Sequence, residues 1–380
     1  MQRENQSKLN KLIQELCPEG VEYRKLGEVL TICNGKDYKN LNPGSVPVYG
    51  SGGVLTYVDK SLYDKPSVLI PRKGSLDKLY YLEIPFWTVD TLFYTDINCS
   101  LVVPKFVYYV LQKEHLEDLN VAGGVPSLTQ KVLNLVPIPV PPLPVQSEIV
   151  RILDAFTALT AELTAELTAR RKQYEYYRDR LLKFDDLTGG VRRVKISDIG
   201  SVSMCKRILK HETSSEGDVP FYKIGTFGKE PDAYISWETY EKYKSNYSYP
   251  KKGDILISAA GTIGRTVVFD GEPAYFQDSN IVWVDNDETM VLNKFLYYFY
   301  QTNPWKVSTG GTIARLYNDN IASVKIPLPP LSEQRRIVSI LDRFDALCND
   351  LTQGLPAEID ARRKQYEFYR DRLLDFQRKE

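Results

Sequence analysis

Two stretches of the chain carry apolar residues at heptad spacing. Steps of four and three residues alternate from Ile149 to Leu181 and again from Ile337 to Leu373, where one extra step of four occurs. This pattern is typical of long helices that pack along an apolar seam, so we expect two helices in an antiparallel coiled coil. Because the extra step is a stutter beside Gly354 and Pro356, we expect the second helix to be kinked or interrupted there.

The segments before the heptads have the short apolar runs and turn residues of strands. Residues 67–71 and 254–258 are apolar runs followed by glycine, and helices are expected near 106–112 and 295–301. The predicted fold is α+β, with two pseudo-symmetric domains separated by the two long helices. The predicted order is an N-terminal helical segment (1–20), a globular domain (21–143), a helical spacer (144–190), a second globular domain (191–330) and a second helical spacer (331–380).

An internal duplication explains this order. Residues 169–182 and 361–374 are identical except that Phe368 replaces Tyr176. The match continues in the proline-rich links and at the start of the heptads, where 138–143 aligns with 326–331 and 149–156 aligns with 337–344. The globular parts share a skeleton but little surface sequence. Two related domains that recognise different things are therefore expected.

A shorter repeat lies inside the first helix, where Thr-Ala-Glu-Leu occurs at 160–163 and again at 164–167. One unit of four residues lengthens a helix by about 6 Å and rotates its end by roughly 40°. These residue types are also simply good helix formers.

Composition narrows the class of protein. The 49 basic and 49 acidic residues balance, which argues mildly against nucleic-acid binding, but six cations gather in 169–183 against two carboxylates. The five cysteines are scattered without zinc-ligand spacing, and there are only two histidines. With neither a signal peptide nor a long apolar run, we expect a cytoplasmic chain with reduced thiols and no bound metal.

Signatures of catalysis are missing from the sequence. Neither Gly35-Lys36 nor Gly228-Lys229 is followed by Ser or Thr, so there is no phosphate-binding loop of the ATPase type. Asn303-Pro304-Trp305 lacks the second proline of an amino-methyltransferase motif, and Pro231-Asp232 lacks the spacing of a nuclease core. The sequence indicates a binding and positioning protein rather than an enzyme.

The whole chain resembles the specificity subunit of type I restriction-modification systems, HsdS. The resemblance rests on the segments 326–337 and 361–366 and on the Thr-Ala-Glu-Leu tandem; the first link departs from the pattern at 144–147 but keeps Gln146. It implies two target-recognition domains that each read half of a bipartite DNA site, and a coiled coil that sets their spacing. It also implies two docked methyltransferase (modification) subunits and associated restriction subunits. S-adenosylmethionine, ATP and Mg²⁺ would be used by those partners, and adenine N6 would be methylated.

Candidate DNA contacts lie on glycine-containing loops, where the backbone can approach phosphate and neighbouring side chains supply donors. The alternative is that these glycines only enable turns. The aligned residues Asp90 and Asp278 are expected to make structural hydrogen bonds, with acceptance from a cytosine amino group less favoured. The candidates are Tyr49, Ser51, Arg72, Lys73, Ser75 and Ser127 in the first domain and Lys223, Thr226, Thr262, Arg265, Thr312 and Arg315 in the second.

The duplicated helices supply candidates for partner docking. A spacer does not need the same residues twice, but two copies of one partner do. Tyr174, Tyr177, Tyr366 and Tyr369 fall on the heptad seam and are expected to be core residues first. The docking candidates are Arg170, Arg171, Lys172 and Arg178, with their counterparts Arg362, Arg363, Lys364 and Arg370.

Two other functions are compatible with parts of the sequence. A scaffold of two modules on a coiled coil could bind proteins rather than DNA, and the neutral charge favours this slightly. A self-contained DNA methyltransferase or nuclease is disfavoured by the missing motifs.

Overall fold

The fold is described from a computed structural model that covers residues 2–120, 126–184, 191–306 and 315–379. The chain divides into two compact units. Unit 1 comprises Met1–Thr164 and Glu358–Glu380, and unit 2 comprises Ala165–Ala357. None of the helices in these described ranges combines the length and apolar character that crossing a membrane requires.

Unit 1 contains three small sheets. The four-stranded antiparallel sheet has the order β2-β8-β5-β6, the three-stranded sheet has the order β4-β3-β7, and β1 pairs with β9. The strands are β1 (Tyr23–Lys25), β2 (Leu30–Asn34), β3 (Pro43–Gly50), β4 (Gly53–Val58), β5 (Ser67–Pro71), β6 (Tyr80–Leu82), β7 (Trp87–Thr88), β8 (Leu92–Ile97) and β9 (Pro137–Pro139). The helices are α1 (Gln2–Leu16), α2 (Leu26–Val29), α3 (Pro104–Lys113), a 3-10 turn (Leu116–Leu119), α4 (Gln130–Leu133), the first part of α5 (Leu143–Lys183) and most of α10 (Leu355–Leu373).

Unit 2 repeats this plan strand for strand. Its sheets have the orders β11-β17-β14-β15 and β13-β12-β16, and β10 pairs with β18. The strands are β10 (Arg193–Lys195), β11 (Gly200–Ser203), β12 (Val219–Tyr222), β13 (Tyr234–Ile235), β14 (Ile255–Ser258), β15 (Thr266–Val268), β16 (Tyr275–Phe276), β17 (Ile281–Asn286) and β18 (Lys325–Pro327). The helices are 3-10 turns (Ile196–Asp198 and Lys210–Glu212), α6 (Trp237–Asn246), α7 (Asn293–Tyr300), α8 (Asn318–Ala322), α9 (Leu331–Asn349) and the second part of α5.

The equivalence of the two units extends to the register of their strands. In both three-stranded sheets the inner strand pairs in parallel with the last one, through Tyr49 and Thr88 in unit 1 and through Tyr222 and Phe276 in unit 2. Parallel pairing of such short strands is specific enough that its recurrence marks common descent of the two halves. The predicted α+β fold with two pseudo-symmetric domains and two long helices is confirmed.

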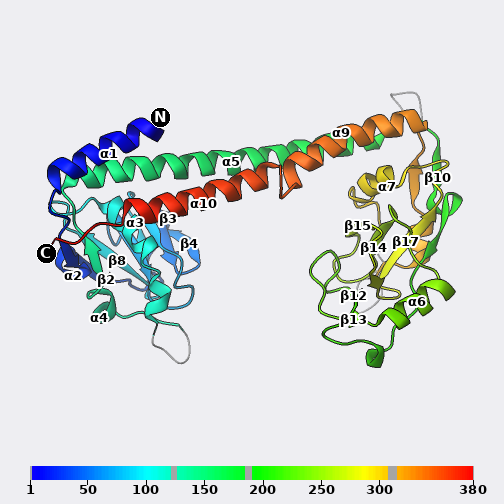
Figure 1. Cartoon of the computed structure of the whole chain (residues 1–380), viewed down its shortest axis with the longest axis horizontal. Coiled ribbons are helices and arrows are strands. Elements are labelled where there is room, and N and C mark those ends of the chain that lie inside the picture. Colours follow the sequence, from blue (N-terminus) through cyan, green and yellow to red (C-terminus); the bar gives the residue numbers. More distant parts are fainter. Residues whose placement is uncertain (1, 121–125, 185–190, 307–314, 380) are drawn as a thin grey trace. The chain divides into compact units, whose positions relative to one another are not determined.

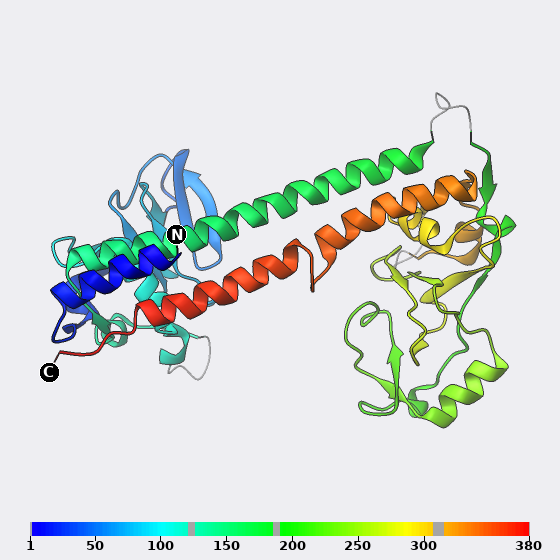
Figure 2. The same ribbon diagram turned by 45° about the horizontal axis from the view of Figure 1, so that its top comes forward.

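The long helices behave as the heptads predict. α5 is a single uninterrupted helix of 41 residues (Figure 1). The second helical stretch is interrupted: α9 ends at Asn349 and α10 begins at Leu355 (Figure 2). A Cβ on Gly354 would lie 2.6 Å from the carbonyl oxygen of Ala346, so this turn requires glycine. The predicted interruption beside Gly354 and Pro356 is confirmed.

Within each unit, aromatic side chains pack along the apolar seam between the long helices. In unit 1, the ring of Phe156 on α5 stacks on Tyr369 of α10 with centroids 5.2 Å apart. In unit 2, Tyr177 on α5 stacks on Phe344 of α9 at 5.9 Å, and Tyr174 is buried beside the same ring. Tyr174 is therefore a core residue, as the heptads predict, and Tyr366 and Tyr369 are half-buried. Tyr177 is 38% exposed, so it lies at the edge of the seam rather than in the core.

Candidate nucleic-acid interface

In unit 1, two of the predicted DNA-contact loops meet through backbone pairing. Lys73 and Ser127 form an antiparallel bridge, although 54 positions separate them in sequence. The amide of Leu128 donates to the carbonyl of Arg72 at 2.9 Å. The end of β5 therefore carries the loops 72–75 and 126–127 side by side.

The third predicted loop of unit 1 joins them through Thr91. The Ser51 amide donates to the Thr91 hydroxyl at 3.3 Å, and the Thr91 carbonyl accepts from the Arg72 amide at 2.9 Å. The hydroxyl of Tyr80 donates to the Ser51 carbonyl at 3.1 Å, and its ring lies 5.6 Å from that of Tyr49. Burial raises the pKa of both phenols, so they remain neutral donors at neutral pH.

Exposure separates the unit 1 candidates. Lys73 and Ser75 are exposed and available to phosphate, whereas Arg72 is half-buried with its guanidinium 5.7 Å from the centre of the Phe93 ring. Asp90 is also exposed, and no hydrogen-bond partner is found for its carboxylate in the described part of the chain. The structural hydrogen bond expected at Asp90 is therefore not found.

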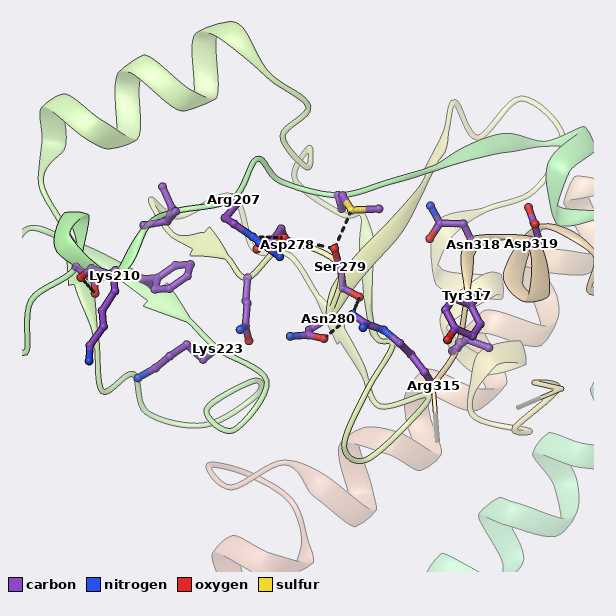
Figure 3. Close-up of a pocket in the computed structure, with 16 residues that line it drawn as sticks. Arg207, Lys210, Lys223, Asp278, Ser279, Asn280, Arg315, Tyr317, Asn318 and Asp319 are labelled. Atoms are coloured by element: carbon purple, nitrogen blue, oxygen red, sulfur yellow. Dashed lines mark hydrogen bonds and ion pairs between the residues drawn. The ribbon is translucent and has the colours of Figure 1, made fainter. Parts of the chain in front are cut away.

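Unit 2 has a deep polar cleft where the corresponding loops meet. The cleft has a volume of about 980 Å³ and is lined by residues of 204–213, 221–223, 277–280 and 315–319. Asp278, Ser279 and Asn280 lie at its centre, with Lys210 and Lys223 on one side and Arg315 on the other (Figure 3). Four cationic side chains face two carboxylates here: Arg207, Lys210, Lys223 and Arg315 against Asp278 and Asp319.

The other unit 2 candidates lie outside the cleft lining. Arg265 is half-buried and donates from Nη1 to the carbonyl of Phe227 at 2.9 Å, so it stabilises the neighbouring turn. The Thr226 hydroxyl accepts from the Lys223 amide at 3.1 Å, which is also a turn contact, whereas Thr262 is exposed. Thr312 and the glycine pairs at 123–124 and 310–311 lie outside the described residues. For all these residues, contact with DNA stays a prediction.

The docking candidates form four equivalent pairs, which lie in three kinds of environment. Arg178 and Arg370 are mostly buried, with side chains 14% and 10% exposed, and each guanidinium lies over a tyrosine ring. Arg170 and Arg362 are half-buried, and each bonds a glutamine three residues on at 3.1 Å. The exposed candidates are Arg171, Lys172, Arg363 and Lys364.

The repeated tyrosines fasten each domain to its helices. The Tyr174 hydroxyl donates to Oε1 of Gln301 at 2.7 Å, and Tyr366 makes the equivalent bond to Gln112 at 2.8 Å. Burial is the main cause that raises the pKa of both phenols. In each unit, therefore, the repeated helix segment holds the end of the domain helix, α7 or α3.

Comparison with known proteins assigns the chain to a family. A family model described as the type I restriction modification DNA specificity domain matches residues 18–170 and 189–361. The chain belongs to this family. A Haemophilus influenzae chain named type I restriction enzyme specificity subunit S.HindORF215P is 49% identical over 390 residues, which cover 97% of this chain and 100% of the relative. The Escherichia coli EcoR124I/EcoR124II specificity subunit is 30% identical, with 95% of each chain covered.

Solved structures share the fold. The S subunit of a type I restriction-modification system from M. genitalium superposes with a TM-score of 0.58 at 16% identity, covering 93% of this chain and 96% of that one. A second chain, from a study of type I complex assembly and conformational transition, gives 0.57 at 18% identity, covering 94% and 98%. Family membership decides against the two alternatives, a protein-binding scaffold and a self-contained enzyme.

Several residues that line the cleft are not among the DNA contacts predicted from the sequence. Arg207 and Lys210 line it from the segment after β11, and Tyr317 and Asn318 line it from the start of α8. None of them has a glycine neighbour, so the pattern of glycine-containing loops does not mark them. The signal available was the run of cations at 206–210, directly after a short strand.

Equivalent backbone positions in the two units carry different side chains. The amide of Leu128 bonds the carbonyl of Arg72 in unit 1, and the amide of Leu316 bonds the carbonyl of Ala259 in unit 2. The same position thus holds a guanidinium in one unit and a methyl group in the other. Ala259 is buried, but the next position reaches the surface and carries Lys73 in unit 1 and Ala260 in unit 2. One scaffold with different surface chemistry at the same place is what two readers of unlike half-sites require.

Proposed function

We propose that this chain supplies sequence specificity to a type I restriction-modification complex, with unit 1 and unit 2 each reading one half of a bipartite DNA site. One observation carries the proposal: the two units share one strand topology but carry different side chains on equivalent loops. The uninterrupted helix α5 would set the length of the unread gap between the halves. Methylation, ATP hydrolysis and cleavage would be carried out by partner subunits.

The proposal predicts that a change in one unit never alters the half-site read by the other unit. The complex with its modification subunits is assembled with Lys73→Ala in unit 1 or Lys210→Ala in unit 2, and methylated adenines are mapped on genomic DNA. We expect each variant to weaken methylation and leave the half-site read by the other unit unchanged. A contiguous recognition site, or changes in both halves from either variant, contradicts the assignment of one half to each unit.

The repeated helix segments support docking of two identical modification subunits. Tyr176 on α5 and Phe368 on α10 occupy the one position at which the repeats differ, and they are 59% and 61% exposed. Each packs edge-on against the next tyrosine, with centroids 5.4 and 5.5 Å apart, so the rings are held in place. An exposed, ordered aromatic ring flanked by cations is the type of residue that dominates binding energy at interfaces.

Substitution at these two rings tests the docking proposal. Native mass spectrometry counts modification subunits per chain for Tyr176→Ala, Phe368→Ala and the double variant. We expect each single variant to weaken one of two binding events by about 30-fold or more, and the double variant to weaken both. Tyr176→Phe is the matched control, because the second copy already lacks the hydroxyl. Two subunits bound with unchanged affinity in the double variant would remove these rings from the interface.

A further inference from the structure

One guanidinium in the unit 2 cleft is both exposed and fixed. Arg207 lies after β11, and its Nε donates to Oδ2 of Asp278 at 3.0 Å. The Arg207 side chain is 68% exposed, whereas the Asp278 carboxylate is only 17% exposed. The carboxylate is thus built into the wall of the cleft, and the guanidinium projects from it (Figure 3).

The loop that carries Asp278 is held on its other side by a second arginine. Nη2 of Arg315 donates to the Ser279 carbonyl at 3.1 Å and to Oδ1 of Asn280 at 3.0 Å. Ser279 has a φ of +59°, in the left-handed region that residues other than glycine rarely adopt. Arg315 therefore stabilises a loop conformation that serine would not favour alone, and this conformation places the Asp278 carboxylate.

In the described part of unit 1, no arginine pairs with Asp90 at the equivalent place. Both units begin this loop with the same backbone bond, from Val89 to the Tyr49 carbonyl and from Gln277 to the Tyr222 carbonyl. Between that bond and the first residue of the next strand, unit 1 has two residues and unit 2 has three; the extra residue is Ser279. The inserted residue and the two arginines are therefore particular to the second reader.

The chemistry of the fixed guanidinium selects one base. Asp278 occupies Nε, which leaves the two terminal amino groups as a planar pair of donors. In the major groove, the O6 and N7 atoms of guanine are the pair of acceptors that such a fork fits. Because the carboxylate already restrains the side chain, less rotamer entropy is lost on binding. Its negative charge also makes this arginine less suited to phosphate than the exposed Lys210 nearby.

We infer that Arg207, held by Asp278, reads a guanine in the half-site of unit 2. This inference rests on the proposed function and adds the base class and the residue pair to it. Arg207 makes the contact, and Asp278 is a positioning residue. The half-site of unit 1 is read without an equivalent pair.

The test selects bound DNA from a library randomised in both half-sites, using the complex assembled with its modification subunits. Wild type should show a guanine at one or more positions of the unit 2 half-site. Arg207→Ala should lose discrimination for one guanine by roughly 5- to 150-fold, leaving the other half-site and the gap unchanged. Asp278→Asn should keep the preference for guanine but weaken it, because the neutral amide restrains the guanidinium less. Arg192→Ala, an exposed arginine of unit 2 outside the cleft lining, is the matched control.

Three outcomes overturn the inference. The first is a unit 2 half-site without guanine, and the second is an Arg207→Ala complex with unchanged specificity. The third is a uniform loss of affinity for all sequences with a salt slope smaller by about one, which identifies a phosphate contact instead. Failure of the wild-type complex to select any bipartite site would count against the proposed function itself. For every variant, unchanged selection at the unit 1 half-site shows that the complex is intact.

Discussion

A buried glutamine joins the globular domain to the long helix in each unit, so the effect of removing it can be tested independently in both units. Gln146, in the first turns of α5, is fully buried. Its Nε2 donates to the carbonyls of Leu101 at 2.9 Å and Pro141 at 2.7 Å, and its Oε1 accepts from the amide of Val103 at 2.7 Å. One side chain thus satisfies three backbone groups, on the link before α5 and at the start of α3.

Gln334 repeats this junction in unit 2. It is also fully buried, donates to the carbonyls of Met290 and Pro329 at 2.9 Å each, and accepts from the amide of Leu292 at 2.9 Å. The expected effect of removing either side-chain amide follows from the number of hydrogen bonds that it makes. Three lost hydrogen bonds at about 1 kcal/mol each, with partners left buried and unpaired, should cost about 3–5 kcal/mol in the free energy of unfolding.

Hydrogen exchange measures the loss of stability separately in each unit. In Gln146→Leu, the amide of Val103 should exchange roughly 100-fold faster or more, since each 1.4 kcal/mol is a factor of ten. In Gln334→Leu, the amide of Leu292 should do the same, and each variant should leave the other unit protected. Gln353→Leu, at an exposed position in the turn between α9 and α10, is the control. If both variants keep these amides protected and lower the free energy of unfolding by less than about 1 kcal/mol, the reasoning from unpaired buried groups is refuted.

Three further predictions address other parts of the chain. The Arg151 guanidinium lowers the pKa of Glu148. This contact therefore stabilises unit 1 above the unfolded pKa of about 4.3, and the stabilisation is lost as pH falls through the folded pKa. In Glu148→Gln, the melting temperature of unit 1 should depend less on pH in this acid range. Gly264 has a φ of +80°, and an added Cβ would lie 2.5 Å from Nε1 of Trp305, so Gly264→Ala should lower the melting temperature of unit 2 by several degrees while Gly225→Ala, with open space, should not. Inserting a third Thr-Ala-Glu-Leu unit into α5 should lengthen the unread gap by one or two base pairs without changing either half-site; a methylome with an unaltered gap contradicts this.

The periodic features of the fold could be predicted from the sequence. The heptads locate α5, α9 and the seam tyrosines because helix packing depends on local spacing. Gly354 and Pro356 mark the interruption because their backbone restrictions are local as well. The helices α3 and α7 and the strands β5 and β14 also lie where the apolar runs predict them.

The binding surface could be predicted only in part, because it depends on which loops meet. Lys73 and Ser127 could be chosen separately as loop residues, but their backbone pairing is a long-range event. The only local mark of Arg207 is the run of cations at 206–210, and its fixed position depends on Asp278, 71 positions away. The structural hydrogen bond predicted for Asp278 is confirmed, since it accepts from Arg207. Its aligned counterpart Asp90 has no such neighbour in the described part of unit 1.

The near-identity of the two repeated helix segments reflects two separate constraints. Tyr174 and Tyr366 must bond the ends of α7 and α3, and the rings of these tyrosines lie against Arg178 and Arg370. Attachment of the domains is therefore sufficient to explain why these four residues recur.

Attachment does not explain the exposed positions of the repeat. Among the described residues, Tyr176 and Phe368 belong to neither hydrophobic core, and the cations Arg171 and Arg363 are exposed, yet each pair recurs in kind. A surface residue free of packing would have diverged as the recognition loops did. The exposed half of the repeat therefore needs a second constraint, and the proposed docking of one identical partner at each copy would supply it.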